Sequence, residues 1–175
     1  MDTKRMFFAG TGGQGILLMG QMISLSAMYE NKSTTFFPSY GPEMRGGTAN
    51  CTVVVSEKSV GCPIIYESDI VVAMNLPSMH KFEPTLATGG IMFLNESIIH
   101  QPHKRDDITV YKIPVNDIAN ELGNAKVANM VMLGAVIRKA NIVGIQTIER
   151  VIREFFEQKS ENLAEINMTA FNHWQ

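Results

Sequence analysis

The clearest indication of the fold is the segment Met6-Phe7-Phe8-Ala9-Gly10-Thr11-Gly12-Gly13-Gln14-Gly15. Its four leading apolar residues stop at a cluster of glycines, which is typical of a buried strand that ends in a tight turn. After the glycines, small and apolar residues recur at helical spacing, at Ile16, Met19, Gly20, Ile23 and Ala27. The stretch therefore predicts a strand, a turn and a helix in succession.

The rest of the chain continues this alternation. Further strands are predicted over 33–37, 49–56, 70–74, 91–94 and 108–113, and further helices over 78–82, 118–122, 126–140 and 148–155. Pro38 is expected to end the second strand, and Gly89-Gly90 to turn the chain into a later one. The tail over 160–175 is weakly patterned and is expected to be docked or frayed.

Alternating strands and helices with a glycine-rich first turn predict an α/β protein. We expect a three-layer α/β/α single domain over residues 1–175, with a mostly parallel, Rossmann-like sheet covered by helices on both faces. The order of the strands does not follow from the sequence.

The glycine turn has the spacing of a phosphate-binding loop at Gly10, Gly12 and Gly15, with Gly13 at its tip and Gln14 beside it. Glycines allow positive φ, and free N–H groups at a helix start favour an anion. The alternative is that these glycines only permit tight packing of strand against helix.

Two specific versions of such a loop fit poorly. A dinucleotide site needs an acidic residue after the second strand, but that strand ends Phe36-Phe37-Pro38, and Glu30 is expected to point into solvent. A Walker A loop needs a Lys-Ser or Lys-Thr pair after Gly15, and none follows. The loop therefore predicts anion binding without naming the ligand.

A second distinctive segment is Tyr40-Gly41-Pro42-Glu43-Met44-Arg45-Gly46-Gly47. Arg45 suits a carboxylate or phosphate, Gly46 and Gly47 let the backbone come close, and Tyr40 offers a flat face with a hydroxyl. The alternative is a surface loop with a solvated Glu43–Arg45 pair. Asn75 is a further contact candidate, because ligands of open α/β sheets collect at the carboxyl ends of strands.

Composition restricts the class of function. The 175 residues include 15 basic and 17 acidic ones, so the net charge of −2 makes nucleic acid an unlikely partner. Two cysteines, Cys51 and Cys62, cannot hold an iron–sulfur cluster or a zinc ribbon alone, and suggest reduced thiols. Four scattered histidines lack metal-ligand spacing, and neither a signal peptide nor a membrane span is expected.

Taken together, the glycine turn and the segment over 40–47 resemble the gamma subunit of the 2-oxoacid:ferredoxin (2-oxoacid:acceptor) oxidoreductases, the family of the pyruvate, 2-oxoglutarate, 2-oxoisovalerate and indolepyruvate enzymes. Further matches run in order along the chain, at Val55-Ser56, 68–75, Gly89-Gly90 and 128–134. The resemblance covers about residues 4–156 and leaves out the tail and the stretch over 100–107.

The resemblance implies a part of an enzyme of the EC 1.2.7 type that lacks a complete active site. Thiamine diphosphate, magnesium and iron–sulfur clusters would belong to alpha and beta subunits and a ferredoxin-like delta subunit, with coenzyme A as substrate and ferredoxin as electron acceptor. This chain would bind none of these cofactors alone, contribute no catalytic or metal-binding residue, and be cytoplasmic. Its cofactor-facing candidates are Gly10, Gly12, Gly13, Gln14, Gly15, Tyr40, Arg45, Gly46, Gly47 and Asn75.

Partner subunits would contact the loop over 40–47 and the Met-rich helix over 128–140, since methionine adapts to irregular surfaces. An isolated chain with an uncovered interface could also form a homodimer. Two alternatives stay open at this level: a free-standing nucleotide- or flavin-binding Rossmann-like oxidoreductase, and a CoA-binding regulatory module.

Overall fold

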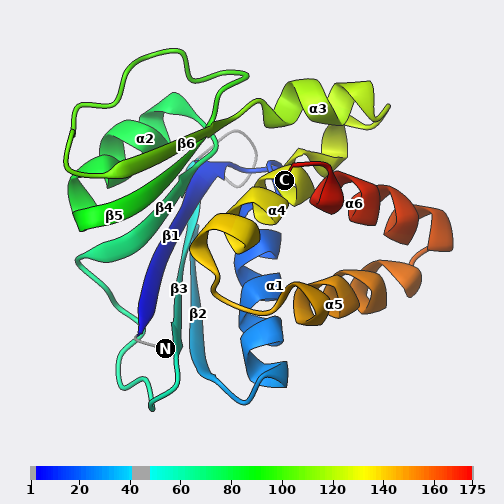
Figure 1. The fold of residues 1–175 in the computed structure, drawn as a ribbon, viewed down its shortest axis with the longest axis horizontal. Coiled ribbons are helices and arrows are strands. Elements are labelled where there is room, and N and C mark those ends of the chain that lie inside the picture. The colour runs from blue at the N-terminus through cyan, green and yellow to red at the C-terminus, as the bar shows by residue number, and fades with distance from the viewer. Residues whose placement is uncertain (1–2, 41–47, 175) are drawn as a thin grey trace.

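The computed structural model describes residues 3–40 and 48–174. They form a six-stranded sheet in the order β2-β3-β1-β4-β5-β6 (Figure 1). β1 pairs in parallel with β4, β4 with β5, and β5 with β6, whereas β3 runs antiparallel to both β1 and β2. β3 is therefore the one reversed strand of these six, and the sheet is mixed. The strands are β1 (Lys4–Thr11), β2 (Ser33–Tyr40), β3 (Thr48–Ser56), β4 (Ser68–Ala73), β5 (Leu86–Asn95) and β6 (Thr109–Ile113).

Helices cover both faces of the sheet, as the sequence predicts (Figure 1). α2 (Leu76–Phe82), followed by a short 3-10 turn (Glu83–Thr85), packs on one face. The other face carries most of the helical mass, with a second 3-10 turn (Ala125–Val127) before α4. Its helices are α1 (Ile16–Tyr29), α3 (Val115–Glu121), α4 (Ala128–Ala140), α5 (Ile145–Glu157) and α6 (Glu161–His173).

The two cores divide the side chains of each central strand between them. In β1, Met6 and Phe8 lie in the larger core under α1 and α4, while Phe7 and Ala9 face α2. Successive side chains of a strand point to opposite faces, so a strand covered on both sides must be apolar throughout. The uninterrupted apolar runs of β1 and β4 are explained in this way.

The largest extensions beyond the predicted strand ends are in β2 and β5. β2 continues through Pro38 to Tyr40, where proline is tolerated because β2 is an edge strand. β5 begins at Leu86, so Gly89 lies within the strand, with φ of 76° and its N–H bonded to the Asp107 carbonyl at 2.8 Å. The expected turn at Gly89-Gly90 was therefore wrong.

The C-terminal tail forms α6, a helix that the sequence did not indicate, and it packs on α4 and α5 (Figure 1). The Arg138 guanidinium of α4 donates to the Phe171 carbonyl at 2.9 Å and to Asn172 Oδ1 at 2.6 Å. At Gly134 a Cβ would lie 2.1 Å from the Phe171 carbonyl oxygen, so the backbones of α4 and α6 touch there.

The expectation of a Met-rich contact surface on α4 was wrong. Met130 and Met132 are fully buried, because α4 is enclosed by α3, α6 and the sheet. Methionine here fills the interior between these elements. None of the helices in the described ranges is long and apolar enough to cross a membrane.

Candidate functional site

The glycine turn joins the carboxyl end of β1 to the start of α1, as predicted. The Gln14 N–H donates to the Thr11 carbonyl at 3.1 Å and closes the turn. Gly13 and Gly15 have φ of 99° and 71°, in the region that favours glycine. Gly15 is the N-cap of α1 and makes no side-chain capping bond, so the first N–H groups of the helix have no cap from it.

The Gln14 side chain is part of the scaffold of the turn. Its Oε1 accepts the Thr11 N–H at 2.7 Å, and its Nε2 donates to the Met74 carbonyl at 3.2 Å. A Cβ on Gly10 would lie 2.6 Å from Gln14 Oε1, so Gly10 leaves room for this bridge. Gln14 thereby ties the ends of β1 and β4 together.

The predicted glycines do different things in the turn. Gly15 packs against Asn129 of α4, where a Cβ would lie 2.2 Å from the Asn129 amide nitrogen. Gly13 is exposed, and a Cβ there would meet no atom within 4 Å. Gly10 and Gly15 therefore fit the packing interpretation, while Gly13 and its partly buried neighbour Gly12 present backbone at the surface.

The Asn75 side chain has both polar groups engaged. Its Oδ1 accepts the Ser78 N–H at 2.9 Å and caps α2, and its Nδ2 donates to Thr11 Oγ1 at 2.7 Å. Asn75 therefore stands beside the glycine turn, as expected for a residue at the end of β4, and holds it from the side of α2.

The second distinctive segment is anchored at the same end of the sheet. Tyr40 pairs with Ala49 in the ladder of β2 and β3, and Thr48 pairs with Thr11 in the ladder of β3 and β1. The two ends of that segment thus lie at the edge that carries the glycine turn. Arg45, Gly46 and Gly47, with Glu43, lie outside the described residues, and of Tyr40 only the backbone is described.

The expectation that Glu30 points into solvent was wrong. Its Oε1 accepts the Gly144 N–H at 2.6 Å, and its Oε2 accepts from Lys32 Nζ at 2.7 Å. Burial raises the pKa of Glu30, but the bonds from Lys32 and Gly144 outweigh it and lower the pKa below its usual value. Glu30 joins the end of α1 to the start of α5 and does not face the glycine turn.

A cavity of about 120 Å³ lies beside the turn, at the carboxyl ends of the strands. The sequence does not single out Asn116, Lys126 or Asn129 as site residues. No local pattern marks these three as neighbours, because they come together only when α3 and α4 fold onto the sheet. The cavity is lined by Gly13, Gln14, Met74, Asn116, Ala125, Lys126, Ala128 and Asn129.

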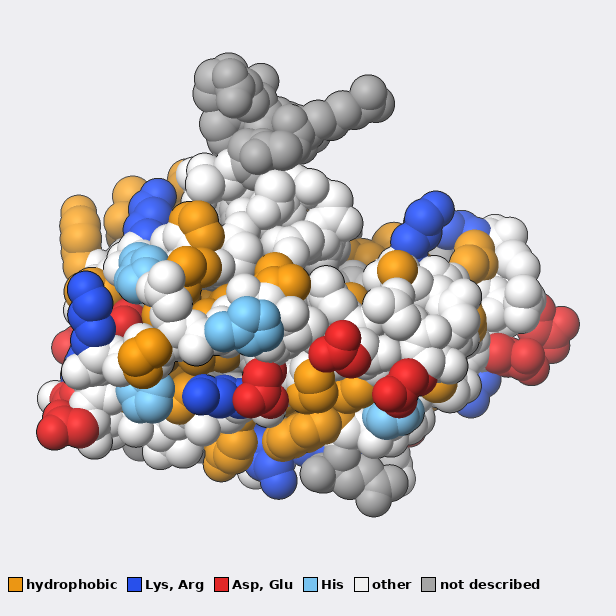
Figure 2. Space-filling view, turned by 90° about the horizontal axis from the view of Figure 1, so that it is seen from above, with side chains coloured by type: hydrophobic (Ala, Val, Ile, Leu, Met, Phe, Trp, Pro, Cys, Tyr) orange, Lys and Arg blue, Asp and Glu red, His pale blue; other side chains and the backbone are white. Residues whose placement is uncertain are grey.

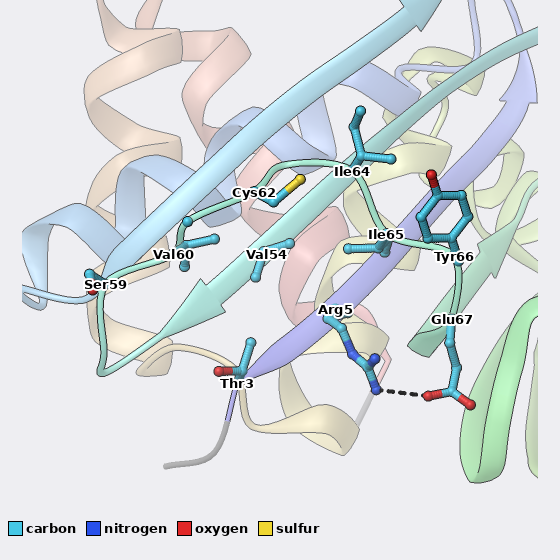
Figure 3. A pocket seen from close by; sticks show the side chains of 11 residues that line it. Thr3, Arg5, Val54, Ser59, Val60, Cys62, Ile64, Ile65, Tyr66 and Glu67 are labelled. Carbon is cyan, nitrogen blue, oxygen red and sulfur yellow. Dashed lines mark hydrogen bonds and ion pairs between the residues drawn. The ribbon is translucent and has the colours of Figure 1, made fainter.

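A larger cavity, of about 460 Å³, lies where the connection from β3 to β4 folds back along the sheet (Figure 3). The Arg5 guanidinium in its wall is bound by Asp69 at 3.0 Å and Glu67 at 3.3 Å, and the hydrogen bond to Asp69 raises the pKa of Arg5. Ile64 and Tyr66 are 56% and 89% exposed. Such exposed apolar side chains are typical of a contact surface.

The described residues contain no group of three His, Cys, Asp or Glu side chains suited to a metal ion. In the view from above Figure 1, the histidine side chains stand apart among acidic and basic ones (Figure 2). His103 is partly buried, and its Nδ1 has no hydrogen-bond partner among the residues described.

The sequence matches the family model for pyruvate ferredoxin/flavodoxin oxidoreductase over residues 5–173. It is 35% identical over 172 residues to the 2-oxoglutarate synthase subunit KorC of Methanocaldococcus jannaschii, covering 97% of this chain and 90% of that protein. It is 36% identical over 166 residues to the ketoisovalerate oxidoreductase subunit VorA of Methanothermobacter marburgensis, covering 94% of this chain. The chain spans only 34% of VorA.

Two solved structures are similar in fold. The 2-oxoglutarate:ferredoxin oxidoreductase from Magnetococcus marinus, with 2-oxoglutarate, coenzyme A and succinyl-CoA bound, superposes with a TM-score of 0.91 at 23% identity, over 99% of this chain and 30% of that chain. The gamma subunit of a keto/oxoacid ferredoxin oxidoreductase from Geobacter sulfurreducens gives 0.81 at 25% identity, over 96% and 94% of the two chains. The chain therefore belongs to the pyruvate ferredoxin/flavodoxin oxidoreductase family, as a member of its gamma-subunit type.

Proposed function

We propose that this chain is the gamma-type subunit of a 2-oxoacid:ferredoxin oxidoreductase, which converts a 2-oxoacid and coenzyme A to an acyl-CoA by oxidative decarboxylation. The observation that carries the proposal is the family match over residues 5–173, which spans nearly the whole fold. The subunit KorC, 35% identical and of similar length, supports a separate subunit in a larger complex.

The redox chemistry is assigned to partner subunits. A four-cysteine cluster needs more thiolates than the two cysteines of this sequence, and Cys51 is fully buried. Thiamine diphosphate, magnesium and the iron–sulfur clusters would therefore lie in alpha, beta and delta subunits, which pass electrons to ferredoxin. The isolated chain would have no turnover.

The edge of the sheet that carries the glycine turn would face the catalytic subunits. Exposed Gly13 and the anchors of the second segment, Tyr40 and Thr48, lie together there. Coenzyme A is bound in the Magnetococcus marinus structure, which supports a contact between this edge and the coenzyme or a partner carboxylate. The uncapped start of α1 favours either anion.

A second contact surface is proposed at the connection between β3 and β4. Tyr66 and Ile64 are exposed there, and a partner would remove their apolar surface from water. Cys62 on the same connection is an exposed free thiol. Such a thiol persists in a reducing compartment, which supports a cytoplasmic location.

The test is to purify the chain alone and together with its co-expressed complex, and to measure viologen reduction that depends on a 2-oxoacid and coenzyme A. We expect activity only from the complex, with thiamine diphosphate and iron in the same chromatographic peak. Turnover by the lone chain, or a yellow preparation that reduces viologen without partners, would overturn the proposal.

The contact surface is tested with Tyr66→Ser, because Tyr66 is 89% exposed and its loss leaves the core intact. We expect the variant to fold but to recover less complex. Met28→Ser is the matched control, since Met28 is 61% exposed on α1, far along the chain from the proposed surface. Equal recovery of the complex with both variants would show that Tyr66 is not part of the interface.

A further inference from the structure

The cavity of about 460 Å³ lies near the amino end of β1, away from the glycine turn. Arg5 and Val54, which pair in the ladder of β1 and β3, line it from the sheet. The other lining residues are Thr3 and members of the connection over 57–67, which contains no helix or strand (Figure 3). Its volume falls within the roughly 300–1,000 Å³ of pockets that enclose a small molecule, so it has room for a large side chain.

The connection presents apolar side chains around this cavity. Ile65 is partly buried and packs against the smaller core, which anchors the connection to the sheet. Its two neighbours, Ile64 and Tyr66, are 56% and 89% exposed and line the cavity as well. Large exposed side chains around a pocket are typical of a protein–protein interface, where tyrosine often contributes much of the binding energy.

The lining has an apolar part and a charged part. Figure 3 shows the apolar side chains of Val60, Cys62 and Ile64 together on one side, and the ion pair of Arg5 and Glu67 on another. An apolar side chain would lose its contact with water in the first part. The second part would then meet whatever group stands next to that side chain.

The charged part carries an excess of negative charge. Asp69 accepts from Arg5 Nε at 3.2 Å and from Arg5 Nη2 at 3.0 Å, so one carboxylate already balances the guanidinium. Glu67 accepts from the same Nη2 at 3.3 Å, and its side chain is 59% exposed. Lys58, at the start of the connection, does not line the cavity. Glu67 therefore favours a positively charged neighbour.

We propose that this cavity receives an apolar side chain of a partner subunit, and that Glu67 pairs with a lysine or arginine beside that side chain. The inference rests on the proposed function and names the chemistry of the partner at the second contact surface. A second copy of this chain fits less well. A two-fold contact brings the same patch of both copies together, and so would place two Glu67 carboxylates in one interface.

Cys62 reports whether the cavity is occupied, because it is an exposed free thiol in the lining. The test compares the isolated chain with the co-expressed complex. We expect iodoacetamide at pH 8 to modify Cys62 about tenfold more slowly in the complex, as read by peptide mass spectrometry.

Gly61→Trp fills the cavity. Gly61 lies in the lining, is not among the glycines with positive φ, and a Cβ there would meet no atom within 4 Å. The variant should therefore fold, which thermal melts of the isolated chain establish. We expect it to lower the recovery of complex about tenfold. Gln158→Trp, at an exposed position after α5, is the matched control and should leave recovery unchanged.

Glu67→Lys tests the charge. It leaves the pair of Arg5 and Asp69 in place but would repel a basic partner. We expect recovery of the complex to fall, and to fall less at 0.5 M salt, where exposed charges are screened. Glu157→Lys, an equal change of charge at an exposed position of α5, should have no effect at either salt concentration.

The outcomes separate this inference from the proposed function. An active complex in which Cys62 is alkylated as fast as in the isolated chain, or in which Gly61→Trp or Glu67→Lys is recovered in full, overturns the inference and leaves the subunit role in place. Protection of Cys62 that rises with the concentration of the isolated chain assigns the cavity to a second copy and also overturns it. Failure to assemble any active complex contradicts the proposed function, and this inference with it.

Discussion

Gly15 lies so close to Asn129 that a Cβ at position 15 would stand 2.2 Å from Asn129 Nδ2 and 3.0 Å from Asn129 Cβ. Gly15 is the N-cap of α1, and Asn129 lies in the first turn of α4. The starts of the two helices are therefore fitted to each other at one wall of the cavity beside the glycine turn.

Gly15→Ala is expected to destabilise the chain through both its positive φ of 71° and this contact. Gly13→Ala is the control, because Gly13 has φ of 99° but open space around it. Both share a conformational cost of about 1–3 kcal/mol. The contact should add about 1–3 kcal/mol for Gly15→Ala alone, measured by urea unfolding.

A double-mutant cycle isolates the contact. Adding Asn129→Ala to Gly15→Ala removes the amide that the new methyl would strike, so the double variant should be more stable than the sum of the two single effects, by about 0.5–3 kcal/mol. Additive effects would mean that Gly15 is required for its conformation alone.

Gln14→Glu is expected to destabilise the turn in a pH-dependent way. The new carboxylate can still accept the Thr11 N–H. Its second oxygen, however, would face the Met74 carbonyl oxygen, to which the Gln14 amide donates in the parent chain. At pH 7 the unfavourable contact should cost about 1–3 kcal/mol. Protonation restores a donor, and the unfavourable contact raises the folded-state pKa of the new carboxyl above its unfolded value of about 4.3. The deficit relative to the parent chain should therefore shrink as the pH falls from 7 toward about 4.3 and be smallest below it.

The control for that variant is Gln146→Glu, at an exposed position in the first turn of α5. It should change the free energy of unfolding by less than about 0.5 kcal/mol at either pH. A deficit of Gln14→Glu that persists unchanged at low pH would argue against the bridge from Gln14 to Met74.

Glu83→Ala is expected to release the connection between β5 and β6. Glu83 is 3% exposed, and its Oε1 accepts the backbone N–H groups of Lys104 and Arg105. Loss of these charge-assisted bonds should cost about 1.5–3 kcal/mol. Limited trypsin digestion followed by mass spectrometry should show faster cleavage after Lys104 or Arg105, while Glu96→Ala, at an exposed position, should digest like the parent chain.

The two cysteines should differ in reactivity. Cys51 is fully buried, and burial raises the pKa of its thiol to about 12, whereas Cys62 is exposed. Iodoacetamide at pH 8 should modify Cys62 alone in the native chain and both thiols in urea, as read by peptide mass spectrometry. Native labelling of Cys51 would mean that the core over α1 and β3 opens readily.

The same thiol gives a dependence of stability on alkaline pH. A thiol of the unfolded chain loses its proton near pH 9, but folded Cys51 keeps it to about pH 12. The unfolded state therefore binds fewer protons in this range, and stability should fall as the pH rises, by at most about 1.4 kcal/mol per pH unit. Cys51→Ala should remove this component of the slope in urea unfolding between pH 8 and 10.

Much of the fold could be predicted because its signals are local. The strands β1 and β4 are buried on both faces, so each is recognisable as a run of consecutive apolar residues. α6 was missed because its buried side includes Ala164, Ala170 and Asn167, which make a weak apolar stripe. Asn167 is tolerated there because its Nδ2 donates to the Leu163 carbonyl at 2.7 Å.

In the candidate site, too, the local features could be predicted and the contacts between distant residues could not. The glycine turn could be predicted from consecutive residues, because only glycine readily adopts the positive φ of Gly13 and Gly15, and the same residues indicated the family. Tertiary structure decided the neighbours: Gln14 bonds to Met74, and Asn129 meets Gly15 beside Lys126. The physical reason is that backbone conformation is a local property, whereas contacts between residues far apart in the chain form only when the helices pack on the sheet.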